Sequence, residues 1–256
     1  MGFETNTGAV PDKWNPDALG IAFPGDLDVG LEFFQVLLTG INDGMRNWSE
    51  GKLNPARAGF PQDMGSYVRF HASVDFLTSK VIDPGGPSTM LIVAKAVGDQ
   101  DPGGTPQQYD PVKVRQQSFY MGSSTGDGRG QGIWVNTPNT LYAMASYTIG
   151  GQVVTRAAQI AAPVNNWLCL IAKFSNTQVV LKDMVSGVKT VTNLEAGAQR
   201  FSNANPVKVG SADGAVRQGY LDCAISGLLS RFTTDDEDAD LYVLCQDIMA
   251  SVNIGI

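Results

Sequence analysis

Residues Ala212 to Tyr242, ADGAVRQGYLDCAISGLLSRFTTDDEDADLY, change from a strand pattern to a helix pattern within one short stretch. From Tyr220 to Phe232, small and apolar residues recur with the two-residue period of a strand that buries one face. The period then becomes helical, because Thr233 or Thr234 can cap a helix and Asp235 to Asp238 place carboxylates at its positive N-terminus. An apolar stripe at helical spacing follows: Leu241, Leu244, Cys245, Ile248 and Met249.

The rest of the chain reads as short strands separated by turns. The sequence holds 29 Gly and 13 Pro, which break it into brief apolar and β-branched runs. About ten or eleven strands are expected between Tyr67 and Phe232, which is too many for one open sheet. Residues Trp167 to Phe174 and Gln178 to Asp183 form the clearest hairpin. These patterns predict an all-β fold with two stacked antiparallel sheets, an N-terminal arm and helix, and a short C-terminal helix.

The closing stretch also resembles the laminin-G-like or concanavalin-A-like jelly roll, whose members often end in a similar glycine, leucine-aspartate and helix-start pattern. Two earlier segments fit the same family, namely Ser66 to Ser73 as an opening strand and Asn166 to Phe174 as a central strand introduced by a tryptophan. The resemblance covers about residues 65 to 250 and implies a jelly-roll sandwich. The residues that carry its closing pattern are Gly219, Leu221, Asp222, Ala224, Leu229, Thr233, Asp236 and Tyr242.

The first 64 residues are expected to form an attachment element, and residues 65 to 256 the sandwich. Residues 1 to 30 carry turn-forming residues and isolated large apolar side chains, which is typical of an arm that lies along another surface. Leu31 to Trp48 shows a helical apolar stripe, although a strand that begins near Val29 is the competing prediction. The helix either caps the sandwich or docks on a partner. The predicted partner-binding residues are Trp14, Phe23, Phe34, Leu37, Leu38, Ile41 and Trp48.

Charge and composition argue against several classes of protein. The net charge is −7 and the 18 Lys and Arg residues are not clustered, so nucleic-acid binding is not expected. No apolar run is long enough to span a membrane, and the N-terminus has no signal-peptide pattern, so we expect synthesis and folding in a host cytoplasm. Cys169, Cys223 and Cys245 lie in apolar patterns and are expected to be buried free thiols rather than a disulfide.

The sequence does not favour catalysis. The only histidine, His71, lies in a predicted strand, and no G-x-S-x-G nucleophile motif occurs. Glycosidases need a pair of carboxylates on either side of the scissile bond, and no E-x-D-x-E strand pattern supplies one here. A non-enzymatic protein is therefore predicted, with a structural role for His71.

Glycan binding is the favoured ligand chemistry, because a sugar ring has an apolar face for an aromatic platform and a rim of hydroxyls for polar side chains. Core packing is the alternative for each aromatic. No metal site or cofactor is predicted, with Ca²⁺ as an alternative bound by oxygen donors. The candidate glycan residues are Trp134, Tyr142, Tyr109, Asp127 and Arg129, and the possible Ca²⁺ donors are Asp99, Asp101, Asp110, Asp127, Asp213 and Asn139.

The resemblance implies a role in a phage virion, where such domains are mounted by an N-terminal segment and recognise cell-surface glycan. We therefore expect a virion structural protein, such as a tail fibre, baseplate or other tail-associated subunit. It would form a homo-oligomer and contact other virion proteins through residues 1 to 64. A capsid decoration protein, a free lectin module and a polysaccharide-degrading enzyme are the alternatives.

Overall fold

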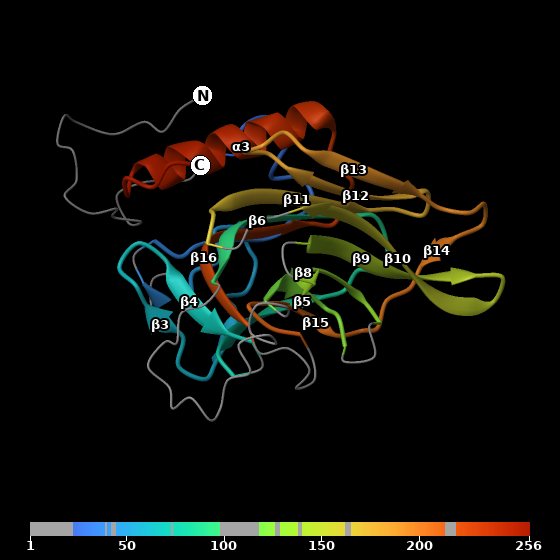
Figure 1. The fold of residues 1–256 in the computed structure, drawn as a ribbon, viewed down its shortest axis with the longest axis horizontal. Helices are drawn as coiled ribbons and strands as arrows, with labels where there is room; N and C mark the ends of the chain where they lie inside the picture. The colour runs from blue at the N-terminus through green and yellow to red at the C-terminus, as the bar shows by residue number, and fades with distance from the viewer. Residues whose placement is uncertain are drawn as a thin grey trace.

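The computed structural model describes residues 23–38, 40–41, 45–72, 74–97, 118–125, 129–137, 140–161, 165–212 and 219–256. Two antiparallel sheets of eight strands each pack face to face, and one helix covers the outer face of one of them (Figure 1). The fold is therefore the all-β, two-sheet sandwich with a C-terminal helix that the sequence predicts.

The first sheet has the strand order β13-β12-β11-β6-β16-β4-β3, and β1 also pairs with β16. Its strands are β1 (Leu31–Val36), β3 (Gln62–Asp63), β4 (Val68–His71), β6 (Ser88–Val97), β11 (Leu168–Phe174), β12 (Gln178–Asp183), β13 (Lys189–Asn193) and β16 (Tyr220–Leu229). The predicted hairpin is confirmed, since β11 and β12 pair antiparallel.

The second sheet has the order β10-β9-β8-β7-β15-β5-β2, and β14 also pairs with β9. Its strands are β2 (Ala56–Ala58), β5 (Phe76–Ile82), β7 (Phe119–Gly122), β8 (Gln131–Thr137), β9 (Thr140–Ile149), β10 (Gln152–Ala161), β14 (Gln199–Arg200) and β15 (Pro206–Val209).

Strand β16 is buried along its whole length because both of its faces are covered. Leu221 and Cys223 face the core between the sheets, whereas Ile225 and Leu229 belong to the cluster on the outer face of the first sheet. The register against β6 shifts between Cys223 and Ile225, which is the irregularity of a β-bulge. The near-continuous apolar sequence of this strand follows from its central position.

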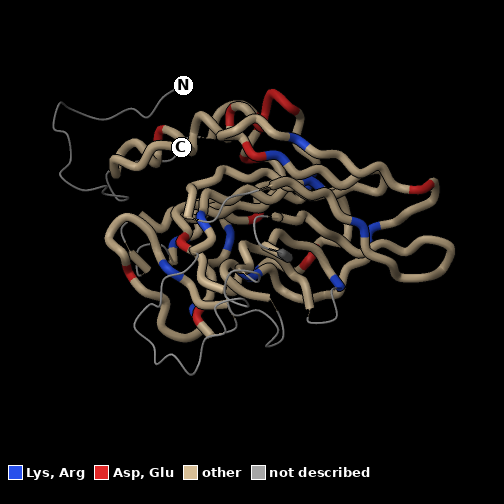
Figure 2. Tube along the Cα trace, viewed as in Figure 1, with Lys and Arg blue, Asp and Glu red and all other residues tan. Residues whose placement is uncertain are grey.

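Helix α3 (Asp235–Ala250) lies along the outer face of the first sheet (Figure 1). Thr234 caps it, with a reciprocal capping box to Glu237, and the acidic positions gather at its start in Figure 2. The predicted apolar stripe is buried, as are the cysteines, which are all free. The predictions of the C-terminal helix and of buried free thiols are confirmed.

The predicted helix over Leu31 to Trp48 is wrong for Leu31–Val36, which form strand β1 paired with β16. Phe33 packs into the core between the sheets and Phe34 into the cluster under α3, so both faces of this segment are apolar. A run that is apolar on every side is compatible with both a strand and a helix. This segment is a strand because it pairs with the available edge of β16. The competing prediction of a strand near Val29 is the correct one.

Strands β1, β2 and β3 are part of the two sheets, although the segment before residue 65 was expected to be an attachment element. Phe34, Leu37 and Leu38 are at most 1% exposed, so they pack inside their own sandwich rather than on a partner. Ile41 is also buried. An attachment role for residues 1–22, which include Trp14, stays a prediction because they lie outside the described residues.

His71 stacks on Tyr220, with ring centroids 4.5 Å apart and an interplanar angle of 9°. In the described part of the chain, no helix is both long enough and apolar enough to cross a membrane.

Candidate functional site

The predicted glycan residues do not converge on one exposed platform. Trp134 on β8 is only 3% exposed and stacks on Phe119, with centroids 5.9 Å apart, so its ring offers no free face. Tyr142 lies opposite it on β9 and is half-buried, and Arg129 lies exposed just before β8. Tyr109 and Asp127 lie outside the described residues, as do all six possible Ca²⁺ donors. Among the residues that are described, no group of three or more His, Cys, Asp or Glu side chains has an arrangement that could hold a metal ion.

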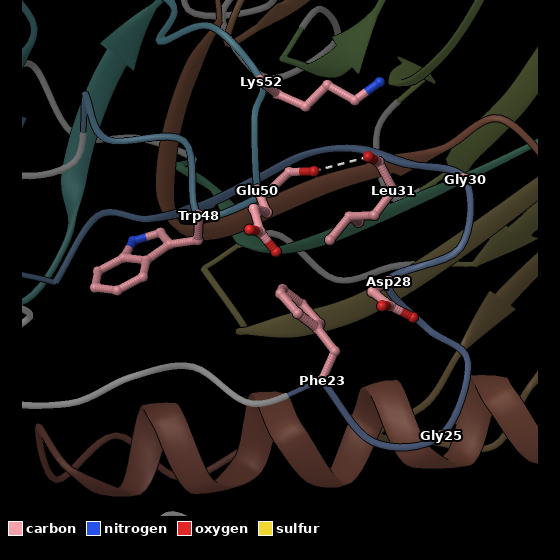
Figure 3. Close-up of a pocket in the computed structure, with 9 residues that line it drawn as sticks. Phe23, Gly25, Asp28, Gly30, Leu31, Trp48, Glu50 and Lys52 are labelled. Carbon is pink, nitrogen blue, oxygen red and sulfur yellow. Dashed lines mark hydrogen bonds between the residues drawn. The ribbon is translucent and has the colours of Figure 1, made fainter.

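A pocket of about 430 Å³ lies elsewhere, between the loop before β1 and the segment that follows β1. Figure 3 shows the Glu50 carboxylate above the Phe23 ring, with Asp28 on one side of them and the Trp48 ring extending away on the other. Phe23 and Trp48 were expected to bind a partner, and the structure brings these two together. The pocket is lined by Phe23, Gly25, Asp28, Gly30, Leu31, Trp48, Ser49, Glu50 and Lys52.

The loop at one side of the pocket is held by turns and by one arginine. Gly25 and Gly30 adopt positive φ values of 58° and 73°, which glycine reaches without steric cost. The Arg231 side chain donates hydrogen bonds to the Val29 carbonyl at 2.7 Å and to the Asp26 carbonyl at 3.0 Å. The loop is therefore tied to the end of β16.

Trp48 is positioned by the side-chain amide of Asn47. The Asn47 Oδ1 atom accepts hydrogen bonds from the backbone N–H groups of Phe34 and Ser49, at 3.1 and 3.0 Å. Its Nδ2 atom donates to the Glu32 and Leu53 carbonyls. The Trp48 N–H donates to the Phe34 carbonyl at 2.9 Å. This network fixes the backbone that carries Trp48 against β1.

The two aromatic rings of the pocket rest on fixed neighbours and remain partly exposed. Phe23 meets the buried Phe34 edge-on, with centroids 5.1 Å apart. The Arg46 guanidinium lies 4.1 Å from the centroid of the Trp48 ring. Both rings are half-buried, so each keeps apolar surface for a ligand.

The polar groups of the pocket carry both signs of charge. Asp28, Glu50 and Lys52 are exposed, and the Lys52 ammonium lies 2.7 Å from Glu32 Oε2. Burial raises the pKa of Glu32, but the hydrogen bonds from Lys52 and Ser230 outweigh it and hold that pKa below the usual value. Lys52 is thus anchored, whereas Asp28 and Glu50 can accept hydrogen bonds from a ligand. Rings beside oxygen acceptors suit a ligand with one apolar face and many hydroxyls.

Sequence reasoning missed Asp28, Glu50 and Lys52 as members of one site. No local motif marks them, because the pocket forms only when the segments before and after β1 are brought side by side. Trp48 and Phe23 were noticed because large apolar side chains in a turn-rich segment need a surface to cover them.

No protein-family model and no curated protein sequence matches the chain. Solved structures do match in fold. The binding domain of botulinum neurotoxin serotype G aligns with a TM-score of 0.58 and 9% identity, over 84% of this chain and 51% of that one. The binding domain of botulinum neurotoxin DC in complex with SialylT aligns at 0.60 and 6% identity, over 84% and 52%.

The Trypanosoma rangeli sialidase in complex with sialic acid aligns with a TM-score of 0.55 and 13% identity, over 92% of this chain and 36% of that one. This chain therefore spans about half the length of the toxin binding domains and about a third of the sialidase. At such low identity the likeness shows the fold alone, namely a β-sandwich of the kind that these proteins contain.

Proposed function

We propose that this chain is a non-enzymatic, glycan-binding β-sandwich that serves as a structural subunit of a phage virion. The observation that carries the glycan half is the pocket beside β1, where the partly exposed rings of Phe23 and Trp48 lie next to the Asp28 and Glu50 carboxylates. Its volume of about 430 Å³ falls within the range of about 300–1,000 Å³ that is typical of ligand pockets.

The chemistry of the pocket favours a sugar. A pyranose stacks its apolar C–H face on an aromatic ring and donates its hydroxyls to carboxylate oxygens. The loop is held by Arg231 and the Trp48 segment by Asn47, so little conformational entropy is lost when a ligand binds. Two of the solved structures with this fold hold SialylT and sialic acid, which supports extending sugar binding to this chain as a proposal.

The two carboxylates of the pocket, Asp28 and Glu50, favour sugar binding without hydrolysis. A glycosidase needs one carboxylic acid that stays protonated near neutral pH, and burial is the usual means of achieving this. Asp28 and Glu50 are both exposed. We therefore propose that they orient hydroxyl groups and do not transfer protons to a glycosidic oxygen.

The virion half of the proposal rests on the laminin-G-like resemblance. A tail fibre, baseplate or other tail-associated subunit needs a stable sandwich that presents a ligand site, together with a segment that contacts neighbouring subunits. Residues 1–22, with Trp14, are the proposed attachment segment, and the subunit is proposed to be a homo-oligomer. Capsid decoration is a second location for the same arrangement.

The glycan half is tested by measuring the binding of neutral and acidic oligosaccharides to the full chain by titration calorimetry. Trp48→Ala is expected to weaken binding about tenfold, the equivalent of about 1.4 kcal/mol. Phe60→Ala removes a ring that is 84% exposed and lies outside the pocket, so it serves as the matched control. Unchanged affinity of the Trp48 variant, or an equal loss in the Phe60 variant, would remove the pocket from the proposal.

The virion half needs a separate experiment. Light scattering on the full chain and on Trp14→Ser, with a folding check on both, is expected to show an oligomer for the first and a monomer for the second. A monomeric full chain would contradict the proposed homo-oligomer.

A further inference from the structure

A second group of polar and aromatic side chains lies on the outer face of the first sheet, and none of its members lines the pocket. Asp222 on β16 pairs in register with Arg69 on β4 and with Lys95 on β6, so the three lie side by side across neighbouring strands. Val68 and Phe70 point into the core between the sheets, which places Arg69 on the opposite face. We call Tyr67, Arg69, Lys95, Trp167 and Asp222 the Asp222 cluster.

In the Asp222 cluster, both oxygens of the carboxylate accept hydrogen bonds, whereas the two cations keep N–H donors that make no hydrogen bond within the cluster. Arg69 Nε donates to Asp222 Oδ1 at 2.6 Å, and Arg69 Nη2 donates to Oδ2 at 3.0 Å. Lys95 Nζ lies 3.4 Å from Oδ2, as an ion pair without a hydrogen bond among the described residues. One carboxylate thus faces two cations, and the N–H donors of the Lys95 ammonium are available.

The excess positive charge is accessible to solvent. Asp222 is fully buried, whereas the side chains of Arg69 and Lys95 are 12% and 22% exposed. Hydrogen bonding to Asp222 raises the pKa of Arg69, so this guanidinium stays charged at every physiological pH. An anion that approaches from solvent would therefore meet two partly desolvated cations, where its attraction exceeds that at an open surface.

Two aromatic rings flank the Lys95 ammonium. Its Nζ atom lies 5.2 Å from the centroid of Tyr67 and 5.1 Å from that of Trp167, and the rings meet edge-on with centroids 5.4 Å apart. Both rings are half-buried, so each leaves apolar surface beside the cations. A ligand that fits carries an anionic group and an apolar face at adjacent positions.

We propose that the Asp222 cluster is a second glycan subsite that binds an anionic sugar. A carboxylate or sulfate accepts hydrogen bonds from Lys95 and from the remaining N–H groups of Arg69, while the sugar ring packs against Trp167. The inference rests on the proposed glycan-binding function and adds to it a preference for acidic glycans. The buried Asp222 holds Arg69 in place and prevents the two cations from repelling each other.

The test compares three probes by calorimetry on the full chain: a hyaluronan hexasaccharide, its carboxyl-reduced neutral form, and a sulfated κ-carrageenan hexasaccharide. Lys95→Met is expected to weaken binding of an anionic probe about tenfold, and the native affinity is expected to fall as salt rises. Lys208→Met is the matched control, because Lys208 also lies over an aromatic ring, 4.9 Å from the centroid of Phe76. Both variants are checked for an unchanged unfolding midpoint.

The outcomes distinguish the proposed subsite at the Asp222 cluster from the proposed glycan pocket beside β1. If anionic and neutral probes bind equally and Lys95→Met changes neither affinity, the second subsite is wrong while the pocket stands. If an anionic probe binds through Lys95 but Trp48→Ala has no effect, the pocket is wrong while the subsite stands. If none of the probes binds, both proposals fail. The carrageenan and hyaluronan arms distinguish sulfate from carboxylate as the anionic group.

Discussion

Two buried aspartates form ion pairs with lysines on the outer face of the first sheet, and the two pairs differ in how far the cations are exposed to solvent. Asp238 of α3 lies 2.7 Å from Lys173 Nζ, and the two side chains are 0% and 3% exposed. Asp222 is equally buried, but its partners Arg69 and Lys95 are 12% and 22% exposed. Helix α3 thus seals one ion pair, whereas the other keeps contact with solvent.

The sealed pair is also more completely bonded. Lys173 Nζ donates to Asp238 and, at 3.1 Å, to the Thr233 carbonyl, and the Thr233 hydroxyl donates to Asp238 Oδ1 at 2.6 Å. These bonds join the helix start to the sheet. The comparison shows that the covered ion pair attaches a helix to the sheet, whereas the cations of the other pair remain in contact with solvent.

Removing each carboxylate gives the largest expected difference. Asp238→Asn leaves the buried ammonium of Lys173 with only the exposed carboxylate of Asp235, 3.6 Å away, as a counter-charge, and is expected to lower the free energy of unfolding by about 3 kcal/mol or more. Asp222→Asn is expected to cost about 1–3 kcal/mol, because Arg69 and Lys95 can reach water. Urea unfolding measures both, with the exposed Asp236→Asn as the control. Equal losses at the two sites would contradict the comparison.

Removing the lysine of each ion pair gives a second test of the difference between the Asp238 and Asp222 sites. Lys173→Met leaves Asp238 buried, with Lys182 at 3.9 Å as its nearest remaining cation, and is expected to cost about 2–4 kcal/mol. Lys95→Met is expected to cost less than about 1 kcal/mol, since Asp222 keeps both hydrogen bonds from Arg69. Urea unfolding measures both costs. A large loss of unfolding free energy for Lys95→Met would mean that this lysine is structural rather than available to a ligand.

The smallest expected effect is a pH dependence at the start of α3. The ion pair with Arg231 lowers the pKa of Glu237 from 4.5 to about 2, helped by the hydrogen bond that its carboxylate accepts from the Thr234 backbone N–H. Its contribution to stability is therefore present above pH 4.5 and is lost as the pH falls toward 2. Because the side chain is partly exposed, the contribution is about 1 kcal/mol.

Glu237→Gln is expected to remove that contribution and to flatten the fall in the unfolding midpoint between pH 5 and pH 2 relative to the native chain. The exposed Asp240→Asn, later in the same helix, is the control. If the two variants have the same pH profile, the Arg231 ion pair does not stabilise the helix start.

The sequence was most informative for α3 and for the hairpin of β11 and β12. The stripe from Leu241 to Met249 and the cap at Thr234 identify α3 without reference to any other part of the chain, because helix capping and amphipathic spacing are local. The hairpin of β11 and β12 was equally readable, since its turn joins adjacent strands. In both cases the interacting residues lie close together in the sequence.

Local reasoning failed where the structure of a segment depends on a partner far away in the sequence. Leu31–Val36 reads as a helix on spacing alone, yet it is a strand because the edge of β16, about 190 residues later, needs a partner for its backbone groups. The same limit applies to Trp134, whose ring is covered by Phe119 on a neighbouring strand. Spacing within a segment does not indicate what covers it.

The sequence by itself determined the fold class, the C-terminal helix and the free cysteines, because periodicity, capping and the absence of a cysteine pattern are properties of neighbouring residues. Only the tertiary structure decided that Phe23, Trp48 and Glu50 line one pocket, and that Asp222 lies beside Arg69 and Lys95. Those residues come from segments far apart in the chain. Their chemistry arises when sheet register and loop packing bring them within a few ångströms of one another, and no local pattern records that distance.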